Sequence, residues 1–243
     1  MIIQRIAKGI KDQDWFVVSV EIMIVVIGIF IGLQVDDWNQ ERKNRELELY
    51  YFEQFAVELE ETIQALKQES DYALRVSSNA LSVEKMLADQ SLSDATMPEF
   101  YEHAYRSFFS SNSRVFKVYL NQLTSDKGAE IVQSREMRRL LGQYLETIDA
   151  RLAWETEWLR IIRAELVKIH HGIGWRGTNR PLARPINDIL SDQNLVGSYA
   201  FISSTQAQIA RNQTQLRIKA EELLTKVKLE LAHLQQAKSI NVE

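Results

Sequence analysis

Twenty consecutive residues near the start of the chain, 16–35, are almost wholly apolar (FVVSVEIMIVVIGIFIGLQV). A helix rises 1.5 Å per residue, so this run extends about 30 Å, which is the thickness of the hydrocarbon core of a bilayer. Trp15 and Trp38 flank the run, and indole rings favour the membrane interface. We therefore predict a transmembrane helix over 16–35, with a short segment 1–15 before it and an extramembrane region 36–243 after it.

The end of the run indicates that the helix stays attached to the protein. A cleaved signal peptide would have a shorter apolar stretch and a cleavage site of small residues, whereas this run ends in Gln34-Val35-Asp36-Asp37-Trp38. We expect an uncleaved anchor. A buried core helix is the alternative, but such a helix is seldom apolar around its whole circumference.

Charged residues near the run bear on its orientation. Three basic residues precede it (Arg5, Lys8 and Lys11), and three more lie beyond it at a greater distance (Arg42, Lys43 and Arg45). Asp36 and Asp37 stand directly at the far interface. The positive-inside rule then favours a cytoplasmic N-terminus and an exported C-terminal region.

One stripe of the run predicts a helix–helix interface. Its residues alternate at spacings of four and three: Glu21, Val25, Gly28, Gly32 and Val35. Gly28 and Gly32 form a G-x-x-x-G pair, which lets two helix backbones approach closely in lipid. An ionisable group such as Glu21 is costly in hydrocarbon and usually faces protein or water. Two alternatives remain for Glu21: it reaches water at the nearby interface, or it lines a path for ions.

Beyond the run, apolar residues recur at the helical spacing of three and four. The first seam comprises Phe52, Phe55, Leu59, Leu66, Ala73, Val76, Ala80, Val83 and Leu87. A later long helix, capped by Ser134, carries Leu141, Leu145, Ile148, Leu152, Glu155, Leu159, Ile162, Leu166 and Ile169. The last helix, from about Asp192, carries Leu195, Tyr199, Ile202, Gln206, Ile209, Gln213, Leu216, Ala220, Leu223 and Val227. Each seam predicts a helix with one buried face.

Two short helices are expected between the first two long ones. Thr96-Met97-Pro98-Glu99 has the form of a capping box, and it predicts a helix to about Phe109. After a loop, a second short helix would end near Gly128. With only 9 glycines and 3 prolines in 243 residues, long uninterrupted helices are expected. The predicted fold is all-α: a transmembrane helix that continues into a stalk, plus an antiparallel helical bundle outside the membrane.

Several activities lack the residues that they need. The chain has no cysteine, which excludes disulfides and thiol chemistry, and its net charge of −4 gives no general attraction to nucleic acid. A G-x-G-x-x-G sequence at 172–177 follows a helix rather than a strand, so it predicts a connection and not a dinucleotide site. The single E-x-x-H at 230–233 is too little for a di-iron bundle. We therefore expect no enzyme activity, metal or cofactor.

One window, 166–187, is basic and contains no acidic residue. It holds Lys168, Arg176, Arg180 and Arg184, which could bind an anionic lipid headgroup, a glycan phosphate or an acidic protein. The alternative is that these side chains pair with acidic helix faces of the same chain or lie solvated in a loop.

Two segments resemble an uncharacterised family of bacterial single-pass, membrane-anchored helical proteins. The first comprises Glu21-Ile22, 25–29, Leu33-Gln34, Trp38-Asn39 and Arg42-Lys43, and the second comprises 119–123, Gly128, Ile131 and 137–144. The chain departs from that family at Gly32, where alanine is expected, and at Asp36-Asp37, where two asparagines are usual. The resemblance implies a single-pass helical architecture in a bacterial membrane, and it implies no reaction. From the resemblance together with the charge asymmetry described above, we expect the bacterial inner membrane as the location, with the C-terminal bundle in the periplasm.

Together these features predict a membrane-tethered assembly or accessory protein that contacts lipid. It would form a homo-oligomer or bind a membrane-protein partner through its anchor and stalk. The alternatives are an envelope sensor or ligand-binding module that signals through a partner, and a subunit of an oligomeric pore.

Overall fold

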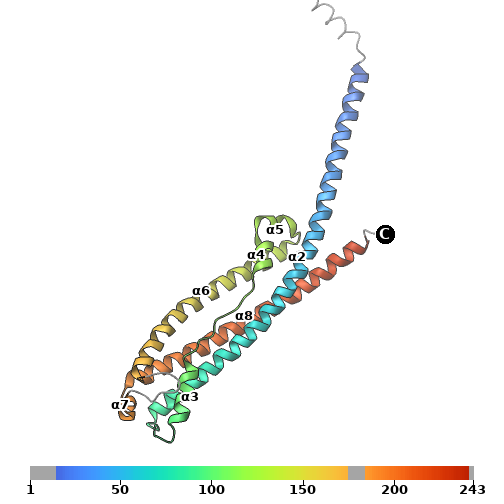
Figure 1. Cartoon of the computed structure of the whole chain (residues 1–243). Helices are drawn as coiled ribbons and strands as arrows, with labels where there is room; N and C mark the ends of the chain where they lie inside the picture. The colour runs from blue at the N-terminus through green and yellow to red at the C-terminus, as the bar shows by residue number, and fades with distance from the viewer. Residues whose placement is uncertain (1–14, 175–183, 241–243) are drawn as a thin grey trace, which may run out of the picture. The chain divides into compact units, whose positions relative to one another are not determined.

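The computed structural model describes residues 15–174 and 184–240, and this part of the chain is all-α, as predicted, with no strand (Figure 1). Its helices are α2 (Trp15–Ala88), α3 (Met97–Ser107), α4 (Val118–Thr124), α5 (Asp126–Ile131), α6 (Arg135–Gly172), α7 (Ile186–Leu190) and α8 (Gln193–Ile240). The chain divides into two compact units, Met1–Glu48 and Leu49–Glu243.

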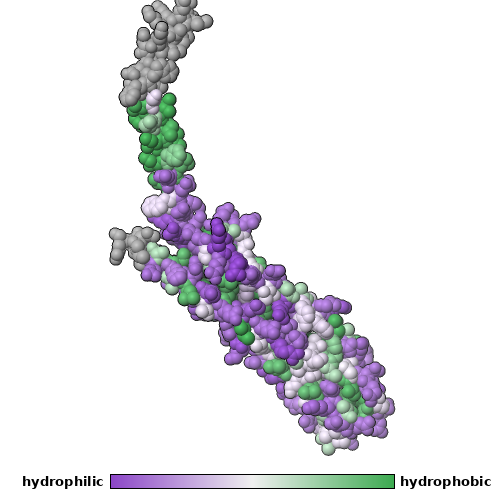
Figure 2. All heavy atoms as spheres, turned by 180° about the vertical axis from the view of Figure 1, so that it is seen from behind, coloured by the Kyte–Doolittle hydropathy of each residue, from purple (hydrophilic) through white to green (hydrophobic). Residues whose placement is uncertain are grey.

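The described part of the first unit is the first half of α2, and its apolar side chains are exposed. Ile22, Met23, Ile24 and Phe30 are each about 60 % exposed, and Figure 2 shows this stretch as a green band. Within residues 15–174 and 184–240, α2 is the one helix long and apolar enough to cross a membrane. No residue of its most apolar stretch is buried.

The second unit contains two apolar cores, which we name core A and core B. Core A includes residues 52–66 of α2, 137–148 of α6 and 216–227 of α8, together with Leu120 and Leu123 of α4. Core B includes residues 73–87 of α2, 159–169 of α6 and 195–210 of α8, together with Phe100 and Ala104 of α3. Each long helix therefore contributes to both cores.

The order of these contributions gives the direction of each helix. Along the chain, α2 and α6 both pass from core A to core B, whereas α8 passes from core B to core A. So α8 is antiparallel to both other long helices, while α2 and α6 are parallel to each other (Figure 1). The cause is the segment 108–117, which is not helical and carries the chain back from α3 at core B to α4 at core A. We name it the return segment.

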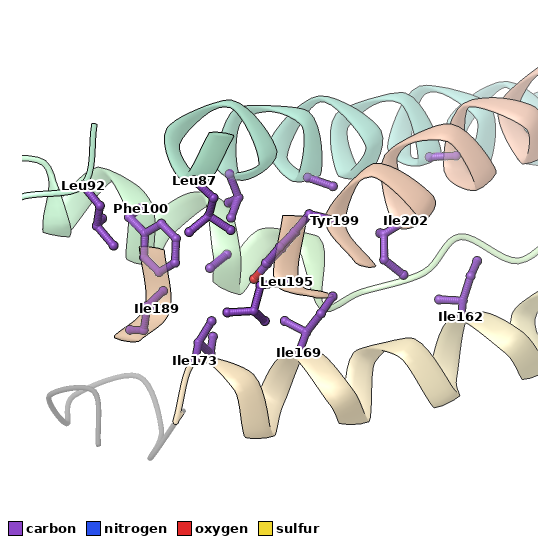
Figure 3. Packing of buried hydrophobic residues seen from close by; sticks show 14 of the residues in the cluster. Leu87, Leu92, Phe100, Ile162, Ile169, Ile173, Ile189, Leu195, Tyr199 and Ile202 are labelled. Atoms are coloured by element: carbon purple, nitrogen blue, oxygen red, sulfur yellow. The ribbon is translucent and has the colours of Figure 1, made fainter. Parts of the chain in front are cut away.

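The predicted seams form the cores. All nine predicted residues of the α2 seam and all ten of the α8 seam are buried. Figure 3 shows Tyr199 of α8 in core B, with Leu87 of α2 on one side and Ile169 of α6 on the other. Because a helix buries the face that recurs every three to four residues, the spacing in the sequence was sufficient to find these residues.

The helix ends were predicted with mixed success. Ser134 caps α6 as predicted, its Oγ accepting a hydrogen bond from the Met137 N–H at 3.2 Å. The prediction of a capping box at Thr96 is wrong, because the Thr96 side chain does not cap α3. Its Oγ1 instead accepts from the Ser93 N–H at 2.9 Å and donates to the Ser91 carbonyl at 3.0 Å, closing the preceding turn.

Candidate functional site

The predicted packing stripe lies on α2 within the first unit, and its face is open. Val25 is 60 % exposed and Val35 58 % exposed. A Cβ atom added at Gly28 or Gly32 would meet nothing within 4 Å. The stripe therefore offers a shallow apolar surface on which a second helix backbone could lie. Glu21 is exposed on the same helix, within the apolar stretch.

The basic window is only partly described, and its two described members pair with acids of this chain. Lys168 Nζ lies 2.5 Å from Glu165 Oε1, and Glu165 also accepts from Ser198 Oγ at 2.9 Å. The Lys168 hydrogen bond is the main reason that the pKa of Glu165 is lowered. Arg176 and Arg180 lie outside the described residues.

Arg184 connects the end of α6 to the start of α8. Its guanidinium donates to the Gly172 carbonyl, to Asp192 Oδ2 at 2.9 Å and to the Asp188 carbonyl at 3.1 Å. The hydrogen bond from Arg184 lowers the pKa of the Asp192 carboxyl, and the effect of burial on that carboxyl is opposite and smaller. Lys168 and Arg184 therefore follow the second of the two interpretations of the basic window: both pair with acidic residues of the same chain.

A second polar site, which the sequence analysis missed, holds the return segment against the bundle. An extended segment outside a sheet leaves its backbone N–H groups without ladder partners, and burying them unpaired is costly. Glu155 of α6 accepts from both the N–H and the Oγ of Ser113 at 2.5 Å. Glu58 of α2 accepts from the N–H groups of Tyr119 and Leu120 at 2.8 and 3.1 Å, where α4 begins. Glu155 thus supplies an acceptor for the return segment itself, and Glu58 supplies one for the first-turn N–H groups of α4, which have no acceptor within their helix.

Further side chains of α2 and α8 complete this site. Glu69 accepts from Ser111 Oγ at 3.1 Å and from Arg114 Nε at 2.8 Å. Thr62 Oγ1 accepts from the Phe116 N–H at 3.2 Å, and Gln213 Nε2 donates to Ser111 Oγ at 3.1 Å. The return segment is therefore bound by side chains from all three long helices.

Burial sets the electrostatics of this site. Glu155 is 3 % exposed, and burial raises the pKa of its carboxyl, while the two hydrogen bonds from Ser113 partly oppose the shift. Burial also raises the pKa of Tyr144, and the Glu58 carboxylate adds to that shift. Because Glu155 and Ser113 are both buried and already satisfied by each other, their arrangement serves to position the chain.

Comparisons with protein-family models, with curated proteins and with solved structures give no match to this chain. The resemblance to an uncharacterised bacterial family therefore stays a prediction, and function has to be argued from the residues of the chain itself.

Proposed function

We propose that this chain is a membrane-tethered, non-enzymatic assembly protein. Residues 16–35 anchor it in a membrane, and the helical bundle lies outside the lipid. The observation that supports this most strongly is the apolar surface of α2, which is exposed around the helix in the first unit. Such a surface is unfavourable in water and is matched by the hydrocarbon of a bilayer.

The proposal places the anchor in a bacterial inner membrane, with its N-terminus in the cytoplasm and the bundle in the periplasm. Asp36 and Asp37 at one interface and the basic residues among 1–15 at the other support this orientation. Membrane lipid and a second membrane helix are the expected partners, and nucleic acid is not.

Assembly would use the stripe that contains Gly28 and Gly32. The test is the oligomer mass in mild detergent for wild type and for a Gly28→Leu/Gly32→Leu variant, which stays apolar but keeps backbones apart. A matched control, Val26→Leu/Phe30→Leu, changes the opposite face of the same turns. We expect the glycine variant to lose the oligomer and the control to keep it. Unchanged assembly of the glycine variant would show that the anchor does not hold the complex together.

A second candidate function, a ligand-binding module, is favoured by one groove in the bundle. This groove of about 580 Å³ is lined, among others, by Tyr72, Arg75 and Asn79 of α2, by Tyr105 of α3 and by Phe109 of the return segment. The Arg75 guanidinium lies 5.6 Å from the centre of the Tyr72 ring, and the rings of Tyr105 and Phe109 pack edge to face. Aromatic faces beside a guanidinium suit an anionic sugar or aromatic acid. Saturable binding of such a ligand that is lost in Arg75→Ala would support this function over simple assembly.

A further inference from the structure

The packing stripe does not end with the apolar run. The same alternation of four and three continues from Val35 to Asn39, Arg42 and Glu46. From Glu21 to Arg42 six steps cover 21 residues, and this average of 3.5 residues is the repeat of a left-handed coiled coil. We name residues 39, 42 and 46 the polar seam.

A groove in the surface of α2 lies on this face. It has a volume of about 370 Å³ and is lined by Gly32, Val35, Asp36, Trp38, Asn39 and Arg42. If the stripe residues are assigned to the a and d positions of a heptad, Gly32 and Asn39 are at a, and Val35 and Arg42 are at d. Asp36 is then at e and Trp38 at g, so all six lining residues occupy positions that face a partner helix. Gly32 has no side chain and leaves the floor of the groove open, and the large side chains of Trp38 and Arg42 form its walls.

The two charged residues of the polar seam have no oppositely charged partner in the part of the chain that the structure describes. Neither Arg42 nor Glu46 forms an ion pair among the described residues, and both side chains are exposed. Arg42 makes one long contact, from Nη2 to Asn39 Oδ1 at 3.4 Å. The seam thus carries a cation and an anion in adjacent layers.

We propose that a second copy of this chain packs in parallel on this face, with Asn39 opposite its own equivalent and Arg42 paired with the partner's Glu46. The proposal rests on the proposed membrane anchor, since two copies inserted with the same orientation necessarily lie parallel. The surface is self-complementary: each dimer would form two equivalent Arg–Glu pairs. A single asparagine at an a position fixes register and favours two strands, at some cost in stability.

The absence of native cysteine permits a direct test, because every disulfide then comes from an introduced residue. Single cysteines at Asn39, Arg42 and Glu46 would be compared with cysteines at Gln40, Glu41 and Asn44 on the remaining faces of the same turns. In membranes that contain the full chain, mild oxidation should give covalent dimers at the first three positions and roughly tenfold less at the other three. Equal yields, or a maximum at the control positions, would overturn the proposal.

Exchange of charges tests the ion pair itself. Arg42→Glu or Glu46→Arg alone would place like charges in adjacent layers and should weaken the dimer roughly tenfold or more. The double variant restores opposite charges and should restore the dimer, and its failure to do so would exclude the Arg42–Glu46 pair. If the wild-type chain neither forms an oligomer by mass nor co-purifies with another protein, the proposed assembly function fails. If it forms an oligomer, or co-purifies with a different protein, without the predicted disulfide pattern, only this inference fails.

Discussion

Substitution of Glu155 tests whether buried carboxylates hold the return segment in place. In wild type, the Glu155 carboxylate accepts two hydrogen bonds from Ser113, and both residues are buried. Glu155→Ala removes both acceptors and leaves the N–H and the hydroxyl of Ser113 inside the bundle. Glu155→Gln keeps an acceptor for the N–H, and its amide NH₂ can donate to Ser113 Oγ.

The expected loss of free energy of unfolding follows from the two hydrogen bonds that Glu155→Ala removes. A buried polar group left without a partner costs about 1–3 kcal/mol, so two such groups cost roughly 2–6 kcal/mol. Removal of a buried carboxylate offsets part of this loss, because its charged form is disfavoured there. We expect Glu155→Ala to lower the free energy of unfolding by about 2–3 kcal/mol and Glu155→Gln to change it by less than about 1 kcal/mol.

The measurement is urea unfolding of the full chain in detergent, followed by far-UV circular dichroism. Glu157→Gln is the control, because this glutamate lies in the same helix but is exposed, and among the described residues its one ion-pair partner is Arg160. Its midpoint should match wild type. A loss in Glu155→Gln as large as in Glu155→Ala would refute the reasoning, since it would show that the charge itself, rather than hydrogen-bond acceptance, holds the return segment.

The same pair of proteins gives a dependence on pH. Because burial raises the pKa of Glu155 above its ordinary value of 4.5, the native state binds this proton more tightly than the unfolded chain does. The contribution of this proton to the free energy of unfolding is fully present below about pH 4.5, and it is lost as the pH rises through the pKa of Glu155 in the native state. Glu155→Gln lacks this component, so its stability relative to wild type should increase as the pH rises above about 4.5. A constant difference would contradict the raised pKa.

Four further perturbations have defined outcomes. Gly128→Ala should cost roughly 1–3 kcal/mol, because the added Cβ would overlap the backbone oxygens of Gln122 and Leu123, whereas Gly142→Ala meets open space and should stabilise α6 by up to about 1 kcal/mol. Thermal melts of both variants check this, and equal effects would contradict it. Glu21→Gln should preserve assembly if the side chain only hydrogen bonds in the interface, and should alter ion flux with assembly intact if it lines a pore. If Glu21→Gln changes neither assembly nor partner binding nor ion flux, Glu21 has no role in the site. A chelator should leave the melting temperature unchanged, and a fall would reveal a structural metal.

The long helices could be predicted because their burial follows from spacing along a single element. Phe52, Leu66 and Val83 recur on one face of α2, and that face is buried wherever the partner helix lies. The parallel direction of α2 and α6 could not be predicted in this way. The sequence predicts a loop only at 110–113, shorter than the non-helical segment 108–117 of the structure. It does not say that the loop returns the chain to core A before α6 begins.

The candidate site also has one part that local sequence could indicate and one part that required the tertiary structure. The stripe on α2 could be proposed from the sequence because G-x-x-x-G and a charge in an apolar run are local signals. The acceptors of the return segment were not found, although Glu155 was visible as a polar residue within an apolar stripe. A buried acid at such a position indicates a donor from another part of the chain, and only the tertiary structure identifies that donor as Ser113.

The central claim is that residues 16–35 remain in the protein and hold the bundle on a membrane. The most direct measurement is the intact mass of the chain recovered from membranes after an alkaline wash that removes peripheral proteins. The claim predicts the whole sequence at 28.2 kDa in the membrane fraction. Recovery in the wash, or a mass lacking the first thirty or so residues by cleavage after the apolar run, would contradict it.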